Sequence, residues 1–299
     1  MTAAGLTTPA VVDELVEIDV ERPSLCRMYS YWYYGGKDHY EIDRDTCHAL
    51  AQHAPGWQLA VRASRAWLRH RVCDLAARGM DQFLVLDAGF PVLGESAVHE
   101  LAAQHLGERP ARVVYADPDP LASLHNRAEL ADNVYVHAVQ ADLADPAAVL
   151  DRSRAAGSFL DRSKPVAVLL PDYSLSHIPD DPGPAEIVRR YRELLAPGSW
   201  VVASHYADPG RRSPAHETAS VLQQQFTTWL GSGWFRIPAE IAACFDGLEL
   251  RDPGVADLTA WPPPLATATP LPVEAGLFLC GVGRIPDPTQ RHGHTGGTR

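Results

Sequence analysis

Short apolar runs alternate regularly with amphipathic segments between residues 83 and 204, and this alternation constrains the fold more than any other feature. Each apolar run is typical of a strand buried on both faces, and each amphipathic segment has helical periodicity. The alternation therefore predicts an α/β fold with a doubly wound, mostly parallel sheet. The expected strands are residues 83–87, 111–117, 134–139, 166–170 and 200–204, and the expected helices between them are residues 95–106, 120–130, 145–157 and 184–195.

The patterning divides the chain into three parts. Residues 1–80 are expected to form an N-terminal helical lid or cap segment, residues 81–285 a Rossmann-like domain, and residues 286–299 a polar, glycine-rich, disordered tail. Further elements are expected outside the central alternation: helices at 43–54, 57–78, 215–230 and 237–245, and strands at 248–250 and 277–283.

The net charge, the apolar runs and the cysteine spacing limit the kinds of partner and the cellular compartment that we expect. The net charge of −11 argues against duplex nucleic acid, because phosphate binding needs concentrated Lys and Arg. We expect no membrane span, since no apolar run approaches the required length, and the N-terminus lacks the pattern of a secretory signal. Five widely spaced cysteines without a CxxC pair favour a cytoplasmic protein with free thiols.

We expect no metal site, because His99-Glu100 lacks the second histidine of a zincin motif and has Ala103 in its place. A small molecule is the expected partner. The oligomeric state stays open, with a homodimer as one option.

Acidic residues follow three consecutive predicted strands. Asp87, Asp117 and Asp142 each stand at a strand end, and ligands of open α/β sheets bind outside these ends. The second acid is placed to accept hydrogen bonds from ribose hydroxyls, and the third from the exocyclic amine of adenine. A strand-end Asp can also simply cap the next helix. Three in register favour a nucleoside-containing ligand.

Two further groups of side chains could carry chemistry. Asp172 and Tyr173 follow the fourth predicted strand, and His177 and His205 stand near strand ends, where imidazoles of ordinary pKa would serve as general bases. Capped turns and structural histidines are the alternatives. The segment from residue 25 to 34 holds five large aromatic rings, more than one helix face can bury, so some are expected to line a substrate pocket: Tyr29, Trp32 and Tyr33 are the candidates.

Ordered motifs along almost the whole chain carry a family resemblance. The N-terminal motif runs from Arg27-Met28-Tyr29 through Gly35-Gly36-Lys37-Asp38-His39-Tyr40 to Asp43-Arg44. Later matches include Asp117-Pro118-Asp119-Pro120, Gln140-Ala141-Asp142-Leu143, His177-Ile178-Pro179-Asp180 and Gly281-Val282-Gly283-Arg284. With these motifs the chain resembles an actinobacterial S-adenosylmethionine-dependent methyltransferase-like family that began as a domain of unknown function.

The resemblance implies a class I methyltransferase fold with S-adenosylmethionine as cofactor. Asp87 and Gly89 would approach the methionine end of the cofactor, Asp117 would hold its ribose and Asp142 its adenine. The element that contains Lys37 would form a lid over the pocket.

The first strand-end loop departs from the family pattern. It reads Asp87-Ala88-Gly89-Phe90-Pro91, with a bulky ring before a proline where the family has a small residue and a second glycine. Proline fixes φ and removes an N–H that could bind a carboxylate. We therefore expect Phe90 to lie in the substrate pocket and the methionine half of the cofactor site to be altered. A rearranged loop that still binds the cofactor is the alternative.

The leading hypothesis is an S-adenosylmethionine-dependent methyltransferase that acts on a small molecule in secondary metabolism. His177, His205 or Asp172 would supply a base if the acceptor is a hydroxyl. A repurposed fold is the second hypothesis: a cyclase, isomerase or lyase that uses Asp172, Tyr173 and the histidines as acid and base. A non-catalytic small-molecule binder that has lost the cofactor is the third.

Overall fold

The computed structural model describes residues 18–35, 38–90, 97–155, 160–261 and 270–287. The helices are α1 (Leu25–Tyr34), α2 (Glu41–His53), α3 (Trp57–Ala77), α4 (Val98–Leu106), α5 (Pro120–Glu129), α6 (Pro146–Ala155), α7 (Pro184–Leu194), α8 (His216–Leu230) and α9 (Pro238–Ala243). The strands are β1 (Gln82–Leu86), β2 (Arg112–Asp117), β3 (Val136–Gln140), β4 (Ala167–Leu170), β5 (Trp200–Tyr206), β6 (Glu249–Leu250), β7 (Ala256–Asp257) and β8 (Phe278–Arg284). Short 3-10 helices are η1 (Leu175–His177), η2 (Leu258–Ala260) and η3 (Val273–Leu277).

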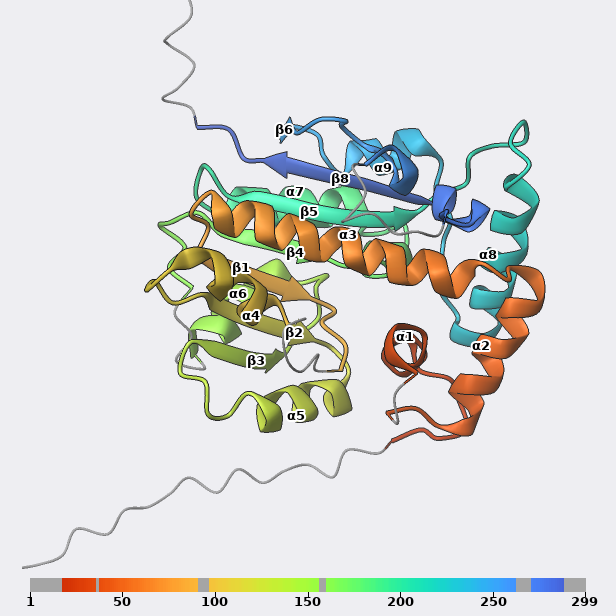
Figure 1. Ribbon diagram of the computed structural model, residues 1–299, viewed down its shortest axis with the longest axis horizontal. Helices are drawn as coiled ribbons and strands as arrows, with labels where there is room; N and C mark the ends of the chain where they lie inside the picture. Colours follow the sequence, from red (N-terminus) through yellow and green to blue (C-terminus); the bar gives the residue numbers. More distant parts are fainter. Residues whose placement is uncertain (1–17, 36–37, 91–96, 156–159, 262–269, 288–299) are drawn as a thin grey trace, which may run out of the picture.

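One sheet organises the molecule (Figure 1). Its strand order is β3-β2-β1-β4-β5-β8-β6, and β7 pairs with β8 outside this path. The five strands β1 to β5 pair in parallel, whereas β8 runs antiparallel to β5 with Trp200 opposite Arg284. The order reverses between β1 and β4, so the chain winds in both directions from β1. The predicted doubly wound, mostly parallel sheet is confirmed.

Both faces of the central strands are buried, which explains why their sequences are continuous apolar runs. In β1, Phe83 and Val85 belong to the cluster on the side of α3 and α4, whereas Leu84 and Leu86 belong to the cluster on the opposite side, to which α6 and α7 contribute. β4 alternates in the same way. Helices therefore cover both faces, as the strand–helix alternation predicted.

The three N-terminal helices pack onto this core. Trp67, Leu68 and Val72 of α3 lie in the same buried cluster as β1, together with Met28 of α1 and Leu50 of α2. In Figure 1, α3 runs along the sheet, whereas α1 and α2 lie beyond the ends of the strands. A lid separate from the Rossmann-like part, with a boundary at residue 80, stays a prediction.

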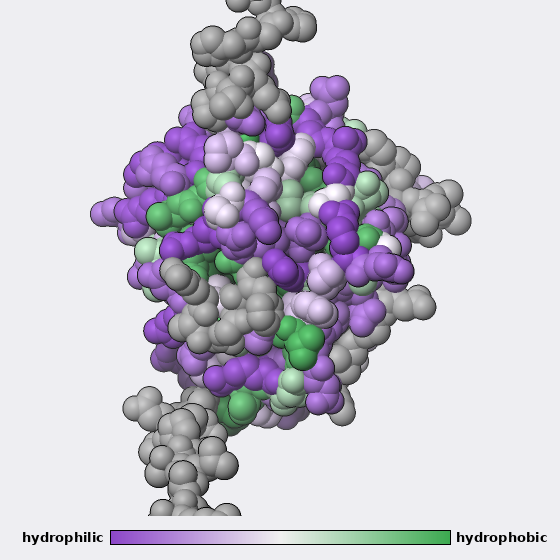
Figure 2. Space-filling view, turned by 90° about the vertical axis from the view of Figure 1, so that its left-hand side faces the viewer, coloured by the Kyte–Doolittle hydropathy of each residue, from purple (hydrophilic) through white to green (hydrophobic). Residues whose placement is uncertain are grey.

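The two ends of the sheet differ in their surroundings. The carboxyl ends of the parallel strands face α1, α2 and α8, on the right of Figure 1. Figure 2 shows the opposite end, which is mostly hydrophilic, with its hydrophobic residues in small, separate patches. None of the described helices is long and apolar enough to cross a membrane.

Most predicted elements occur within a few residues of their expected bounds. The expected elements did not include α1, β7 or the three 3-10 helices, and β7 and the 3-10 helices are too short to show periodicity. Residues 262–269 of the expected proline-rich loop and residues 288–299 of the expected tail lie outside the described residues.

Candidate functional site

A pocket of about 420 Å³ opens at the carboxyl ends of β1, β2 and β3. This is where the topology places a ligand, at the point where the strand order reverses. Its described lining residues come from the start of α1, from four strand-end loops, and from η1 and the turn after it: Ser24, Leu25, Cys26, Asp87, Asp117, Pro118, Asp119, Asp142, Leu143, Ala144, Tyr173, Ser174, His177, Ile178, Pro179 and Pro182.

The loop after β1 has an unusual backbone. Asp87 has a φ of 46°, a left-handed conformation that non-glycine residues rarely adopt. Its carbonyl oxygen accepts a hydrogen bond of 2.9 Å from the Tyr173 hydroxyl. Gly89 has a φ of 69°, and a Cβ at this position would lie 3.2 Å from the same hydroxyl. A strained residue that lines a pocket is typical of a functional site.

Asp117, at the end of β2, supports this loop. One carboxylate oxygen accepts from the backbone N–H of Gly89 at 2.7 Å, and the other from that of Asp119 at 2.8 Å. Burial raises the pKa of Asp117 to about 7, although these two N–H groups oppose the shift. The carboxylate thus joins the loop after β1 to the loop after β2, and it still has lone pairs for a ligand.

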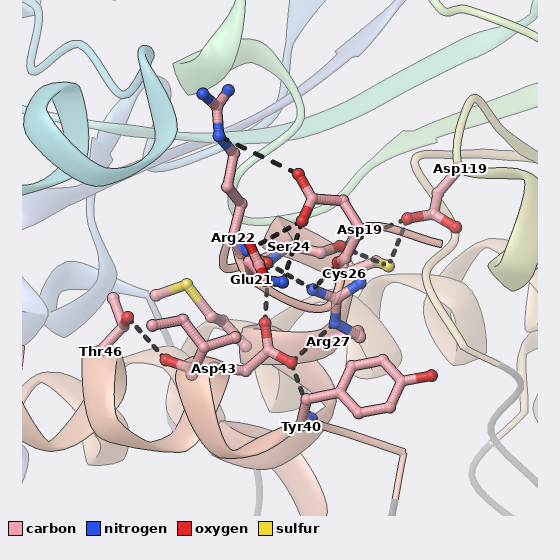
Figure 3. Close-up of polar contacts among 12 residues, drawn as sticks. Asp19, Glu21, Arg22, Ser24, Cys26, Arg27, Tyr40, Asp43, Thr46 and Asp119 are labelled. Carbon is pink, nitrogen blue, oxygen red and sulfur yellow. Dashed lines mark hydrogen bonds and ion pairs between the residues drawn. The ribbon is translucent and has the colours of Figure 1, made fainter. Parts of the chain in front are cut away.

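Asp119 connects the pocket to the N-terminal segment (Figure 3). Its Oδ1 caps α5 by accepting from Leu121 N and Ala122 N, at 2.8 and 3.1 Å. Its Oδ2 accepts from Ser24 Oγ at 3.3 Å and from Cys26 Sγ at 3.1 Å. The start of α1 therefore forms one wall of the pocket.

Asp142 lies on the exposed rim of the pocket, after β3. Its carboxylate accepts from Ala144 N at 2.8 Å, and its neighbour Leu143 is buried in the pocket wall. Pro118 and Pro179 add apolar surface. An acid beside apolar walls can bind a flat, polar-edged ring such as a nucleobase.

The pocket is strongly acidic. It contains the carboxylates of Asp87, Asp117, Asp119 and Asp142, and no Lys or Arg is among its described lining residues. Burial, followed by the charges of Asp117 and Asp142, raises the pKa of Asp87 well above its usual value. Carboxylates that repel one another in this way favour a ligand with positive charge.

His177 is the predicted histidine that lines the pocket. Its Nδ1 lies 2.7 Å from Ser232 Oγ, and its Nε2 makes no hydrogen bond with the described residues. Burial and the neighbouring His205 lower the pKa of His177 to about 3. The imidazole is therefore neutral at pH 7, and its Nε2 is buried without a partner among the described residues.

His205 lies outside the pocket. It is buried at the end of β5, where its Nδ1 donates to the Tyr206 carbonyl oxygen at 2.8 Å and its Nε2 faces Arg236 Nη1 at 3.2 Å. Burial lowers its pKa to about 3, and Arg236 acts in the same direction. These contacts hold the His205 side chain in the core.

The residues expected around a substrate lie mostly in the core beside the pocket. Asp172 is buried and accepts a hydrogen bond from the hydroxyl of Tyr33, which is half-buried. Tyr29 and Trp32 are buried in the main hydrophobic cluster, and the hydroxyl of Tyr29 contacts that of Tyr206. None of the four is among the pocket's described lining residues.

Phe90 is also buried outside the pocket's described lining. Its ring packs against Cys26 and Ala122 and lies 5.2 Å from the ring of His125. Lys37 and Pro91, on which the lid and the altered loop depend, lie outside the described residues.

Several residues that line the pocket were not predicted from the sequence. Ser24, Asp119 and Ile178 were not named as site residues. The Asp-Pro-Asp-Pro and His-Ile-Pro-Asp motifs contain two of them and were the available signal. Ser24 had none, because only the packing of α1 brings it to the strand ends.

Comparisons with known proteins show similarity in both sequence and fold. A family model described as S-adenosyl methyltransferase matches residues 13–286. The crystal structure of a Thermobifida fusca YX protein, described as a candidate methyltransferase, is 32% identical, covers 90% of this chain and 97% of that one, and has a TM-score of 0.79. That of a DUF574 family protein from Streptomyces avermitilis MA-4680 is 30% identical, covers 90% of this chain and 100% of that one, and has a TM-score of 0.80.

A more distant structure, from Bordetella parapertussis, shares the fold at 18% identity with a TM-score of 0.52, and covers 89% of this chain and 81% of that one. Among curated proteins, no match was found.

Proposed function

The chain belongs to the S-adenosyl methyltransferase family, and we propose that it transfers a methyl group from S-adenosylmethionine to a small molecule in secondary metabolism. The observation that carries this proposal is the pocket, in which acids from three consecutive strand ends line one cavity. Its volume of about 420 Å³ lies in the range of small-molecule sites. We assign the reaction to the cytoplasm, since the five cysteines are free thiols.

The described residues fit the cofactor of this family. S-adenosylmethionine has a sulfonium and an ammonium against a single carboxylate, and the acidic pocket suits this net positive charge. Asp117 would accept from the ribose hydroxyls, and Asp142 from the adenine amine. Asp87 would lie nearest the sulfonium, because it follows β1 at the centre of the sheet.

When bound, S-adenosylmethionine supplies an electrophilic methyl group. The chain must then align the acceptor with this methyl group and remove the acceptor's proton. We assign the acceptor's proton to His177, because it is the predicted histidine that lines the pocket. Asp172, Tyr173 and His205 remain the other candidates for acid–base work, and only Tyr173 of these lines the pocket.

Calorimetry with S-adenosylhomocysteine and S-adenosylmethionine tests the cofactor. We expect both to bind the wild-type protein, and Asp117→Ala and Asp142→Ala to weaken binding about tenfold or more through the lost hydrogen bonds. Asp45→Asn serves as the control, because this exposed residue of α2 is not among the lining residues and should leave affinity unchanged.

Turnover is tested by incubating the protein with S-adenosylmethionine and a panel of small molecules, with release of S-adenosylhomocysteine as the readout. If the wild-type protein binds neither S-adenosylmethionine nor S-adenosylhomocysteine, the methyltransferase function is refuted. Binding without acceptor-dependent release would favour the repurposed enzyme or the non-catalytic binder.

A further inference from the structure

Arg236, in the segment that follows α8, is a buried cation that donates to acceptors of three other residues. Its side chain is 8% exposed. Nη2 donates to the carbonyl oxygen of Ile178 at 2.9 Å and to Asp180 Oδ1 at 2.7 Å. Nη1 donates to Nε2 of His205 at 3.2 Å. Arginine is seldom buried unless it is paired, and the planar guanidinium presents donors to several acceptors at once.

The network includes a neutral histidine at the end of β5. A guanidinium has only donors, so Nε2 of His205 accepts from Arg236, and Nδ1 carries the proton that it donates to the Tyr206 carbonyl oxygen at 2.8 Å. The backbone of Arg236 is fixed as well. Its N–H donates to the same carbonyl oxygen at 3.1 Å, and its own carbonyl oxygen accepts from Asp208 N at 2.9 Å. The guanidinium is therefore held firmly against β5.

Other residues of the same segment contact η1, directly before Ile178. Ser232 Oγ lies 2.7 Å from Nδ1 of His177, and Trp234 N donates to the carbonyl oxygen of Ser176 at 2.8 Å. Between them, Gly233 has a φ of 111°, and a Cβ at this position would lie 3.1 Å from Cε1 of His177. The segment after α8 thus holds this part of the chain through both backbone and side-chain contacts.

The residues held in this way form one wall of the pocket. His177, Ile178 and Pro179 are among the described lining residues, whereas Arg236 is not. Residues that line a binding site keep a productive geometry only when packing and hydrogen bonds from behind fix them. Arg236 supplies such hydrogen bonds at Ile178 and Asp180, on either side of Pro179.

We propose that Arg236 is a positioning residue of the cofactor pocket, and that its guanidinium keeps the wall of His177, Ile178 and Pro179 in the position in which S-adenosylmethionine binds. This inference rests on the proposed function. Without the guanidinium, the carbonyl oxygen of Ile178 loses this donor and the wall is free to move. If the wall then occupies the binding position about one tenth of the time, the apparent affinity falls about tenfold.

Calorimetry with S-adenosylhomocysteine tests this role, at a temperature at which every variant is folded. Arg236→Met should weaken binding about tenfold, because it removes all the donated hydrogen bonds but keeps an unbranched side chain. Arg236→Lys should recover part of the affinity, because an ammonium can still donate to Ile178 or Asp180 but lacks the planar fork of donors. Equal affinities of Arg236→Met and the wild-type protein would overturn the inference while leaving the proposed function intact.

Gln82→Met is the matched control. Gln82 is fully buried, its Nε2 donates to the carbonyl oxygens of Asp161 and Pro165, each at 3.2 Å, and its Oε1 accepts from Asp161 N at 2.7 Å. It fixes a loop as Arg236 does, but at the start of β1, away from the pocket. Chemical denaturation should show lower stability in both variants, and only Arg236→Met should lose affinity. An equal loss of affinity in Gln82→Met would also overturn the inference.

Asp180→Ala and Arg236→Lys decide the question if Arg236→Met does not fold. The side chain of Asp180 is 89% exposed and is not among the described lining residues, so its removal should leave the fold intact and act on the pocket through Arg236. We expect each variant to bind S-adenosylhomocysteine about two- to fivefold more weakly, the range for a partly exposed ion pair. Wild-type affinity in both would overturn the inference. If the wild-type protein binds neither S-adenosylhomocysteine nor S-adenosylmethionine, the proposed function fails together with the inference.

Discussion

Asp117 shows how a single residue can join two loops and also line a pocket. Its carboxylate holds two backbone N–H groups from different loops and faces the pocket. Its pKa of about 7 means that roughly half of the carboxyl groups are ionised at neutral pH without ligand. Ribose hydroxyls can donate two hydrogen bonds only to the ionised form, so binding should lower this pKa.

Affinity for S-adenosylhomocysteine should therefore fall about tenfold as the pH is lowered from 8 to 6, because a carboxyl group with this pKa must lose a proton to bind. Calorimetry at three pH values measures the effect. In Asp117→Asn, binding should be weaker and less dependent on pH. Equal affinity of the wild-type protein at pH 6 and pH 8 would contradict the assignment.

For Asp87, the sequence predicted the position of the residue but not its backbone conformation or its contacts. The sequence pattern predicted that Asp87 stands at the end of a strand, whereas its φ of 46° depends on the conformation of the loop that contains it. The hydrogen bond from Tyr173 to its carbonyl oxygen joins residues 86 positions apart. No local pattern encodes such a contact.

Among the elements, α1 and α2 are joined by one buried ion pair (Figure 3). Arg27 Nε donates to Asp43 Oδ2 at 2.7 Å, and both side chains are almost fully buried. Asp43 also accepts from Ser24 N before α1 and from Tyr40 N before α2, each at 2.8 Å. The first and last parts of the N-terminal motif thus meet at one joint, which holds Ser24 and Cys26 at the pocket.

Arg27→Met should lower the free energy of unfolding by about 3–5 kcal/mol, because it leaves the buried Asp43 charge without its cation. Chemical denaturation measures this loss. The control is Arg44→Met, since the pair of Arg44 with Glu41 is exposed and should contribute less than about 1 kcal/mol. Similar losses in the two variants would show that the joint does not stabilise the fold.

The elements themselves were the most predictable part of the structure. The central strands and helices have strong periodicity, and tertiary packing moved their ends by only a few residues. The segment from residue 25 to 34 was less legible. Its aromatic residues are too many to lie on one side of a helix. In the structure, α1 buries Tyr29 and Trp32 because the sheet, α3 and α8 surround this helix.

For the whole molecule, burial of His205 couples folding to pH. Its folded pKa of about 3 lies below the ordinary value of 6.5. Between these values the unfolded chain binds the additional proton, so this contribution to stability is present above pH 6.5 and is lost as the pH falls toward 3. The cause is the buried site beside Arg236, in which an imidazolium would face a second cation.

Between pH 7 and pH 5, this histidine should reduce the free energy of unfolding by about 2 kcal/mol. Buried carboxyl groups with raised pKa values, Asp117 among them, act in the opposite direction over this range, so a difference between two proteins isolates the effect. We expect the wild-type protein to lose about 2 kcal/mol more than His205→Gln, measured by denaturation at both pH values. If the free energy of unfolding has the same pH dependence in both proteins, the proposed effect of His205 is refuted.

The sequence by itself determined the alternation of strands and helices, the doubly wound sheet and the three strand-end acids that line one pocket. These features depend on local periodicity and on a topology that brings the carboxyl ends of parallel strands to one edge. Only the tertiary structure decided that His177 borders the pocket while His205 lies in the core. Burial and partners depend on which distant segments pack together, and neither is encoded in the residues next to each side chain.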